Sequence, residues 1–342
     1  MLRKVVSTSN IEVPLSAIAY LRDLQSQFLD IYAAQHANLG SSDLIQRRRH
    51  LFEQAGLGNV YWQVISSLTS LEVVEKGYRE HLIAPFLACI PKHEADMLRS
   101  VHVGLLQTFD PNAWAIQTPS GEELVVLHAE LPYILSFHAE VQAAIGKLLR
   151  KGQASEVAAL ADWGLDFVCS KFGEPTYSPY PLVDVELDFT EFMQVQQLTM
   201  AYELFVIAHE FAHIVLGHTA KLAEVPLRLA GLKVQKMTWD HKLELDADIK
   251  AIRWLHGLNK DNDNIFIRFV ALYPLICCEV LVLLDFINVH FGSFGPTSTH
   301  PTALARLEHI ASEGQELMTG HEQIELATWI EHVSLNRLAH LP

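Results

Sequence analysis

HEFAH, at residues 209–213, lies inside an apolar stretch that favours a helix. Side chains four residues apart lie one above the other on the same face of an α-helix. His209 and His213 can therefore direct both imidazoles toward one divalent metal ion. Glu210, which follows the first histidine, can then reach a water molecule on that ion. The stretch predicts one long helix over residues 190–218 that carries a metal site.

The composition is that of a globular protein. Half of the 342 residues are hydrophobic and 19% are charged. The net charge of −15 argues against a nucleic-acid backbone or an anionic membrane as the main partner. The most apolar stretch, 265–291, is divided by Pro274 and several charged residues into pieces too short to cross a bilayer. Since we find no secretory signal, no membrane span and no CxxC pair, we expect a soluble, cytoplasmic protein.

Hydrophobic periodicity predicts a mostly helical α+β fold. Residues 1–108 are expected to form an N-terminal helical region, with helices over 60–84 and 92–107. Residues 112–117 and 123–128 are predicted to pair as a β-hairpin. Further helices are predicted over 131–151, 241–257, 264–291, 301–313 and 320–338.

The second region, residues 109–342, is expected to be the metal-binding domain. It contains an insert around 152–189, whose later part is rich in glycine and proline and is expected to be a surface loop. The pattern leaves the structure of the connection over 223–240 open.

A catalytic zinc ion needs three protein ligands and one position open to water, so a third ligand should follow HEFAH. Glu244 and Asp248 are four residues apart and share a helix face, whereas Asp246 points away from both. We predict Glu244 as the third ligand. Asp248 would accept a hydrogen bond from a ligand histidine and fix its ring. An acidic, solvated helix face is the alternative, and HEFAH upstream favours the ligand interpretation.

The residues after His213 exclude the metzincin class. Metzincins need glycine three residues and a ligand six residues after the second histidine. Those positions hold Leu216 and Thr219 here. Because His218 is out of register, we do not expect it to bind zinc. A His, His, Glu site of the gluzincin type remains.

A fourth feature is Thr299-His300-Pro301, with Arg306 downstream. Pro301 suits the first turn of a helix, so His300 can project from the helix entrance into a cleft. Together with Arg306 it could stabilise a developing oxyanion. The alternative for His300 is an ordinary surface histidine.

Four elements in this order resemble the CaaX prenyl protease and HtpX-type zinc metallopeptidases. Asn112-Ala113-Trp114-Ala115, with the strand that follows it, is similar to their hairpin. HEFAHIVLGH resembles their HExxHxxxGH helix, ELDAD at 244–248 their ExxAD segment, and THP with Arg306 their THPxxxxR segment. The resemblance covers roughly residues 100–312, with gaps. Many family members are embedded in membranes, whereas we predict no membrane span in this sequence. We therefore do not expect this chain to share their prenylated substrates. A soluble relative, such as the phage-exclusion type of bacterial peptidase with HExxH, is a second candidate.

The resemblance implies a zincin-like fold with a small sheet beside the HExxH helix, and a role for each matching residue. His209, His213 and Glu244 would hold one zinc ion, Glu210 would be the catalytic base, and Asp248 would orient a ligand histidine.

The same resemblance places further residues around the substrate. His300 and Arg306 would lie near the tetrahedral intermediate. The strand from Asn112 through Ala113 and Trp114 to Ala115 would lie at the edge of the cleft, where a substrate backbone can pair with it.

We therefore expect a zinc-dependent endopeptidase that acts on protein or peptide substrates. One alternative is a regulated or phage-defence-type protease, latent until an activating partner opens the cleft, with 152–189 or 223–240 as its cover. Another is a non-catalytic interaction module that keeps the metal site. Glu210 argues against this last reading, because a purely structural site needs no base there.

Overall fold

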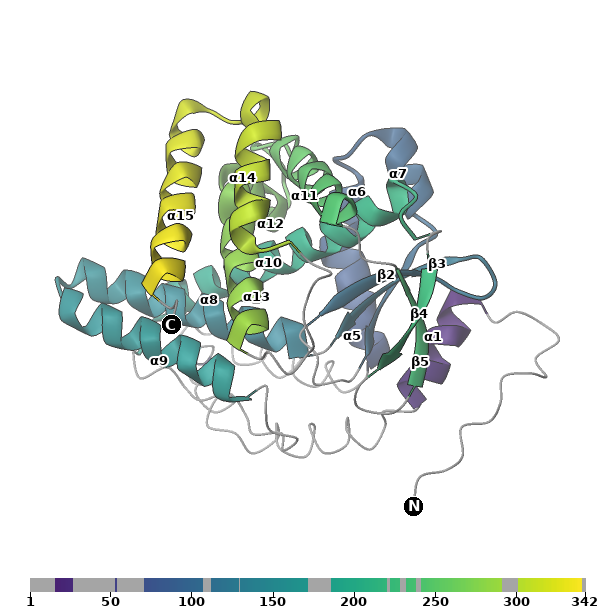
Figure 1. Cartoon of the computed structure of the whole chain (residues 1–342), viewed down its shortest axis with the longest axis horizontal. Coiled ribbons are helices and arrows are strands. Elements are labelled where there is room, and N and C mark those ends of the chain that lie inside the picture. Colours follow the sequence, from purple (N-terminus) through teal and green to yellow (C-terminus); the bar gives the residue numbers. More distant parts are fainter. Residues whose placement is uncertain are drawn as a thin grey trace, which may run out of the picture.

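The computed structural model describes residues 16–26, 53, 71–106, 112–128, 130–171, 186–219, 222–227, 232–237, 241–290 and 301–339. The chain is mostly helical, with a small three-stranded sheet at one side (Figure 1). The predicted α+β, mostly helical class is confirmed.

The helical elements follow the chain in three groups. The first group is α1 (Ala17–Ser26), α5 (Leu71–Gly77), a π-helix (Tyr78–Ile83), α6 (Ala84–Leu87) and α7 (Lys92–Leu98). The second is α8 (Glu130–Arg150), α9 (Ala154–Lys171) and α10 (Phe189–Val215). The third is α11 (His241–His256), α12 (Ile265–Leu272), a 3₁₀ turn (Pro274–Ile276), α13 (Cys277–His290), α14 (Ala303–Glu313), a second 3₁₀ turn (Gln315–Leu317) and α15 (Gly320–Ala339).

Helix α10 is the centre of the fold and contacts α7, α8, α11, α12 and α13. It begins with a capping box, in which the Asp188 carboxylate accepts from the Glu191 N–H and the Glu191 carboxylate accepts from the Asp188 N–H, each at 2.9 Å. It is long and apolar enough to cross a bilayer, but 72% of its most apolar window is buried inside the fold. This burial is what a core helix requires, and the predicted long helix is confirmed.

The sheet has the order β1-β3-β2 and combines β1 (His102–Leu106), β2 (Ala113–Gln117) and β3 (Glu123–His128). β3 pairs parallel with β1 and antiparallel with β2. The predicted hairpin is therefore confirmed, but the helix predicted over 92–107 is wrong beyond Leu98. Every residue of β1 is buried, and pairing with β3 satisfies a backbone that local propensity assigned to a helix.

The two faces of the sheet pack against different helices. Ala113, Ala115, Val125 and Leu127 belong to the large core that includes α10. Residues of opposite parity pack with α1 in a smaller cluster: Trp114, Ile116, Leu124 and Val126. This alternation is the period of two that a strand imposes. The sheet is thus enclosed between α1 and the metal-motif helix.

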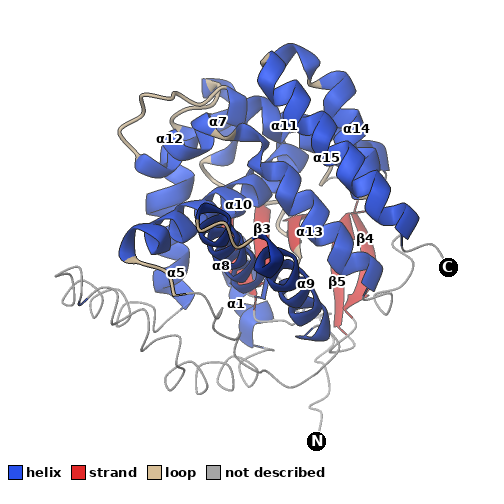
Figure 2. Ribbon diagram, turned by 90° about the vertical axis from the view of Figure 1, so that its left-hand side faces the viewer, coloured by secondary structure: helices blue, strands red, loops and turns tan. Residues whose placement is uncertain are grey.

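Three further segments differ from the sequence pattern or extend it. The helix predicted over 264–291 is interrupted, because Pro274 lacks an N–H and cannot continue α12. Within the insert, α9 is a helix that lies beside α8 (Figure 2), and residues 172–185 lie outside the described residues. The connection over 223–240, whose structure the sequence pattern left undecided, is part of an antiparallel hairpin of β4 (Leu222–Leu227) and β5 (Leu232–Met237). β5 contacts β2.

Glu75 joins the N-terminal helix to the sheet. Its carboxylate, 4% exposed, accepts hydrogen bonds from Arg22 at 2.7 Å and Gln25 at 2.9 Å, both on α1. It also accepts from the Leu105 N–H of β1 at 3.1 Å. Burial alone would raise the pKa of Glu75, but hydrogen bonds from His102, Arg22 and Leu105 outweigh burial and lower the pKa to about 2.

This lowered pKa predicts a specific acid sensitivity. A carboxyl group whose pKa is lower in the folded state stabilises the fold above its unfolded pKa, about 4.3 for glutamate. The contribution is lost as pH falls through the folded value of about 2. We therefore expect the difference in unfolding free energy between wild type and Glu75→Gln to shrink between about pH 5 and pH 2. Urea unfolding across this range measures it.

Glu80→Gln is the matched control, because the Glu80 side chain is 53% exposed. Its difference from wild type should stay small at every pH. A Glu75→Gln difference that is independent of pH would contradict the role given to this carboxylate.

Candidate metal centre

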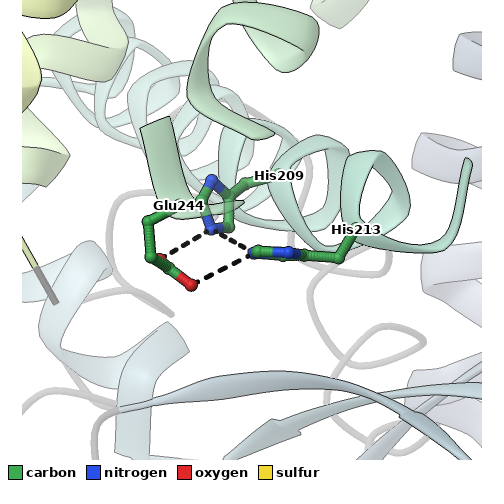
Figure 3. Close-up of side chains that lie close together, drawn as sticks. All are labelled: His209, His213 and Glu244. Atoms are coloured by element: carbon green, nitrogen blue, oxygen red, sulfur yellow. Dashed lines mark hydrogen bonds and ion pairs between the residues drawn. The ribbon is translucent and has the colours of Figure 1, made fainter. Parts of the chain in front are cut away.

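Three buried side chains from two helices converge at one point (Figure 3). His209 and His213 lie one turn apart on α10, and Glu244 lies in the first turn of α11. The two Nε2 atoms are 3.1 Å apart. Glu244 places Oε2 3.4 Å from His209 Nε2 and Oε1 3.3 Å from His213 Nε2. The exposed fractions are 7%, 1% and 1%, so the cluster is shielded from bulk water.

A second carboxylate lies behind the first histidine. Asp248 is 0% exposed, one turn after Glu244 on α11, and its Oδ1 lies 3.0 Å from His209 Nδ1. Arg306 of α14 donates to both oxygens of Asp248, from Nε at 2.7 Å and from Nη2 at 2.5 Å. Burial would raise the pKa of Asp248, but the adjacent Arg306 charge holds it below its usual value. The carboxylate is therefore kept ionised beside the histidine.

The electrostatic field at the cluster attracts a cation. Burial would lower the pKa of His209, but Asp248 and Glu244 outweigh burial and raise it to about 10. Without an ion, the imidazole therefore holds a proton between the two carboxylates. A metal ion competing for this position gains the same attraction.

Of the two further predicted catalytic residues, Glu210 lies among the described residues and His300 does not. Glu210 follows His209 on α10 and is 7% exposed. Within the described part of the chain, no hydrogen bond or ion pair engages its carboxylate. His300 lies outside the described residues, so its predicted place beside the oxyanion stays a prediction.

Arg306 is bound to Asp248, and its predicted place beside the oxyanion stays a prediction. It is 9% exposed, and its guanidinium is bound in a two-point ion pair with Asp248. An oxyanion contact needs donors directed at the substrate carbonyl. The geometry instead favours Arg306 as the support of Asp248.

β2, which carries the predicted substrate strand, is an outer strand of the three-stranded sheet. The Asn112 carbonyl accepts from the His128 N–H at 2.9 Å, so Asn112 directs its backbone groups toward β3. Because this direction alternates along an antiparallel strand, the backbone N–H and C=O groups of Trp114 also point toward β3. The backbone groups of Ala113 and Ala115 point to the opposite edge. Within the Asn112–Ala115 segment, these two residues direct their backbone groups away from β3, on a strand that β5 also contacts.

Pattern reasoning set His218 aside, but the structure brings it to the cluster. Its Nδ1 lies 2.9 Å from Nδ1 of His213, and the side chain is 6% exposed. Sequence spacing excluded His218 only as a ligand. Gly217 is the feature of the sequence that could have predicted this position of His218, because a glycine just past a helix end turns the next residue back onto the last turn.

Residues 135–324 match the peptidase U49 family. The match begins in α8 and ends in α15, so it contains the helices that carry the histidines, Glu244, Asp248 and Arg306, but not the sheet. No curated protein and no solved structure matches the chain. Since the matched residues are more than half of the 342, the chain belongs to the peptidase U49 family.

Proposed function

We propose that this peptidase is a zinc-dependent endopeptidase, with His209, His213 and Glu244 as the ligands. The observation that carries the proposal is the convergence of three buried side chains, whose nitrogen and oxygen atoms approach one another to 3.1, 3.3 and 3.4 Å. Two ligand atoms on one tetrahedral zinc ion, each about 2.0–2.1 Å from it, lie about 3.3 Å apart. Two imidazoles and one carboxylate are also a donor set that suits zinc. The residues present therefore fit the ion.

The order of motifs supports a gluzincin-type site. HEFAHIVLGH, ELDAD and Arg306 follow one another as in the CaaX prenyl protease and HtpX-type enzymes. The central position of α10 and the packing of α11 against it agree with a zincin-like arrangement.

When bound, zinc would supply a Lewis acid that polarises the scissile carbonyl and lowers the pKa of its water. Glu210 is the general base in this proposal: it takes the proton of the attacking water and delivers it to the leaving amine nitrogen. Its place directly after His209, with its carboxylate engaged by no described partner, suits this task. The burial of the cluster keeps competing bulk water out.

Asp248 and Arg306 hold the site in shape. Asp248 Oδ1 lies 3.0 Å from His209 Nδ1, so its charge favours the proton on Nδ1 and leaves Nε2 of this ring unprotonated and directed at the ligand point. Arg306 fixes the Asp248 carboxylate at two points. We assign both residues to positioning, and neither to contact with the substrate.

The proposed substrate is an extended peptide. It would pair with the outward backbone groups of Ala113 and Ala115, because a peptide without structure of its own can add to a sheet edge through main-chain hydrogen bonds alone. β2 also contacts α10, which carries the metal motif.

The metal content of the purified chain tests the proposal. We expect one zinc ion per chain by elemental analysis. Glu244→Gln should lower zinc affinity by more than the roughly 100-fold attributed to a supporting residue, because it removes a charged ligand. Competition with a chromophoric chelator measures this affinity.

Asp246→Asn is the matched control. Asp246 lies two residues from Glu244 on α11, its side chain is 36% exposed, and it pairs with Lys242 at 2.6 Å. Its zinc affinity should equal that of wild type. Equal zinc affinity in Glu244→Gln and wild type would contradict the ligand assignment.

A further inference from the structure

We propose that His218 is a positioning residue that accepts a hydrogen bond from His213 Nδ1 and so fixes the ring that presents Nε2 to zinc. The inference rests on the proposed function. It gives a role to a side chain that the ligand spacing alone leaves unused.

The end of α10 places His218 against His213. The Gly217 N–H donates to the Ile214 carbonyl at 3.0 Å, and the His218 N–H donates to the His213 carbonyl at 2.8 Å. Gly217 has a φ of 70°, a conformation that favours glycine. These features form a Schellman motif, which brings the second residue past the helix back beside the last turn. This contact is commonly hydrophobic, whereas here it joins two imidazoles.

The two rings meet through their nitrogens. Nδ1 of His213 lies 2.9 Å from Nδ1 of His218, and the ring centroids are 5.1 Å apart. The residues are 1% and 6% exposed, so water cannot replace the bond easily. At this distance, one nitrogen must carry a proton and the other must offer a lone pair.

The ligand role decides which ring donates. Nε2 of His213 lies 3.1 Å from His209 Nε2 and 3.3 Å from Glu244 Oε1, at the ligand point. A histidine that binds a metal does so through an unprotonated nitrogen. Neutral His213 therefore carries its proton on Nδ1 and donates it to Nδ1 of His218. The proton of His218 is then on its own Nε2.

The residue after His218 anchors this turn to the sheet. Thr219 is 2% exposed, and its hydroxyl donates to Glu123 Oε1 of β3 at 3.0 Å. The turn that carries the acceptor ring is thus tied to the sheet through Thr219. His209 is oriented by a carboxylate and His213 by a neutral ring, so the second support adds no further negative charge to the buried cluster.

Two substitutions of equal shape test the inference. Asparagine places its Oδ1 near the position of histidine Nδ1 and can accept the bond, whereas leucine has the same shape without an acceptor. We expect His218→Leu to lower zinc affinity about 10–100-fold and His218→Asn to stay within a few-fold of wild type. The visible spectrum of the Co²⁺-loaded protein should shift in His218→Leu and be retained in His218→Asn. The same pair of changes at His256, at the end of α11, is the control and should leave zinc affinity unchanged.

Each outcome of these substitutions supports or contradicts the role proposed for His218. Equal losses in His218→Leu and His218→Asn would show a packing role, and unchanged affinity in both would show no role; either outcome overturns the inference while the zinc site stands. A wild type without zinc would instead overturn the proposed function. ¹⁵N NMR of the zinc-loaded wild type needs no variant. It should show the proton on Nδ1 of His213 and none on Nδ1 of His218, and the reverse pattern would overturn the assignment.

Discussion

Glu210→Gln should retain its zinc ion and lose about 10²–10⁴-fold in kcat, the range for a general base. Glutamine keeps the size of the side chain but cannot accept the proton of the attacking water. The proton moves only in the transition state, so kcat should fall while KM changes little. Peptide hydrolysis at saturating substrate, with zinc content measured on the same sample, gives both quantities.

The matched control for this prediction is Glu203→Gln. Glu203 lies on the same helix, seven residues earlier, and accepts a hydrogen bond from the Tyr78 hydroxyl at 2.9 Å. Burial raises its pKa to about 7 despite this bond, so about half of this group is neutral near pH 7, and glutamine resembles that protonated form. The control should keep wild-type kcat. Substantial hydrolysis by Glu210→Gln would remove Glu210 from the mechanism.

Local signals in the sequence predicted the parts of the fold that local interactions determine. The spacing of His209 and His213 and the alternation in the hairpin strands follow from backbone geometry within one element. Glu244 could be selected because it shares a helix face with Asp248. The structure brings Glu244 to the two histidines.

Contacts between segments that lie far apart in the sequence could not be predicted from local patterns. β1 forms by parallel pairing with β3, and a single strand does not reveal its partner. Asp248 and Arg306 are 58 residues apart, so no helical period connects them, and the motif placed Arg306 near the substrate. His218 depends on the turn at Gly217, which pattern analysis used only as a helix terminator. Packing thus determines these supporting residues, while local spacing indicates the candidate ligands.

Arg306→Met should reduce the free energy of unfolding by about 3–5 kcal/mol, the cost of breaking a buried ion pair from one side. Methionine fills part of the space but leaves the Asp248 carboxylate, 0% exposed, without its two-point partner. Because Asp248 then holds His209 less firmly, zinc affinity should also fall. Urea unfolding of the metal-free chain separates the loss of stability from the loss of zinc.

A surface ion pair provides the control. Arg253 lies 3.6 Å from Glu316, with side chains 48% and 74% exposed, so Arg253→Met should cost only about 0–1 kcal/mol. Equal stability of the two variants would contradict the buried role. An oxyanion role for Arg306 makes the opposite prediction, with stability unchanged and kcat alone reduced.

The double variant Asp248→Asn/Arg306→Met shows whether Arg306 acts through Asp248. If it does, the two single changes are strongly non-additive, because removing both partners leaves no unpaired buried charge. The double variant should then be more stable than Arg306→Met alone. Additive losses would mean that Arg306 stabilises the fold through other contacts, and the assignment of this residue as a support of the histidine would fail. The cycle therefore tests the chain of contacts from Arg306 through Asp248 to His209, which spans three helices and ends at the proposed zinc ligand.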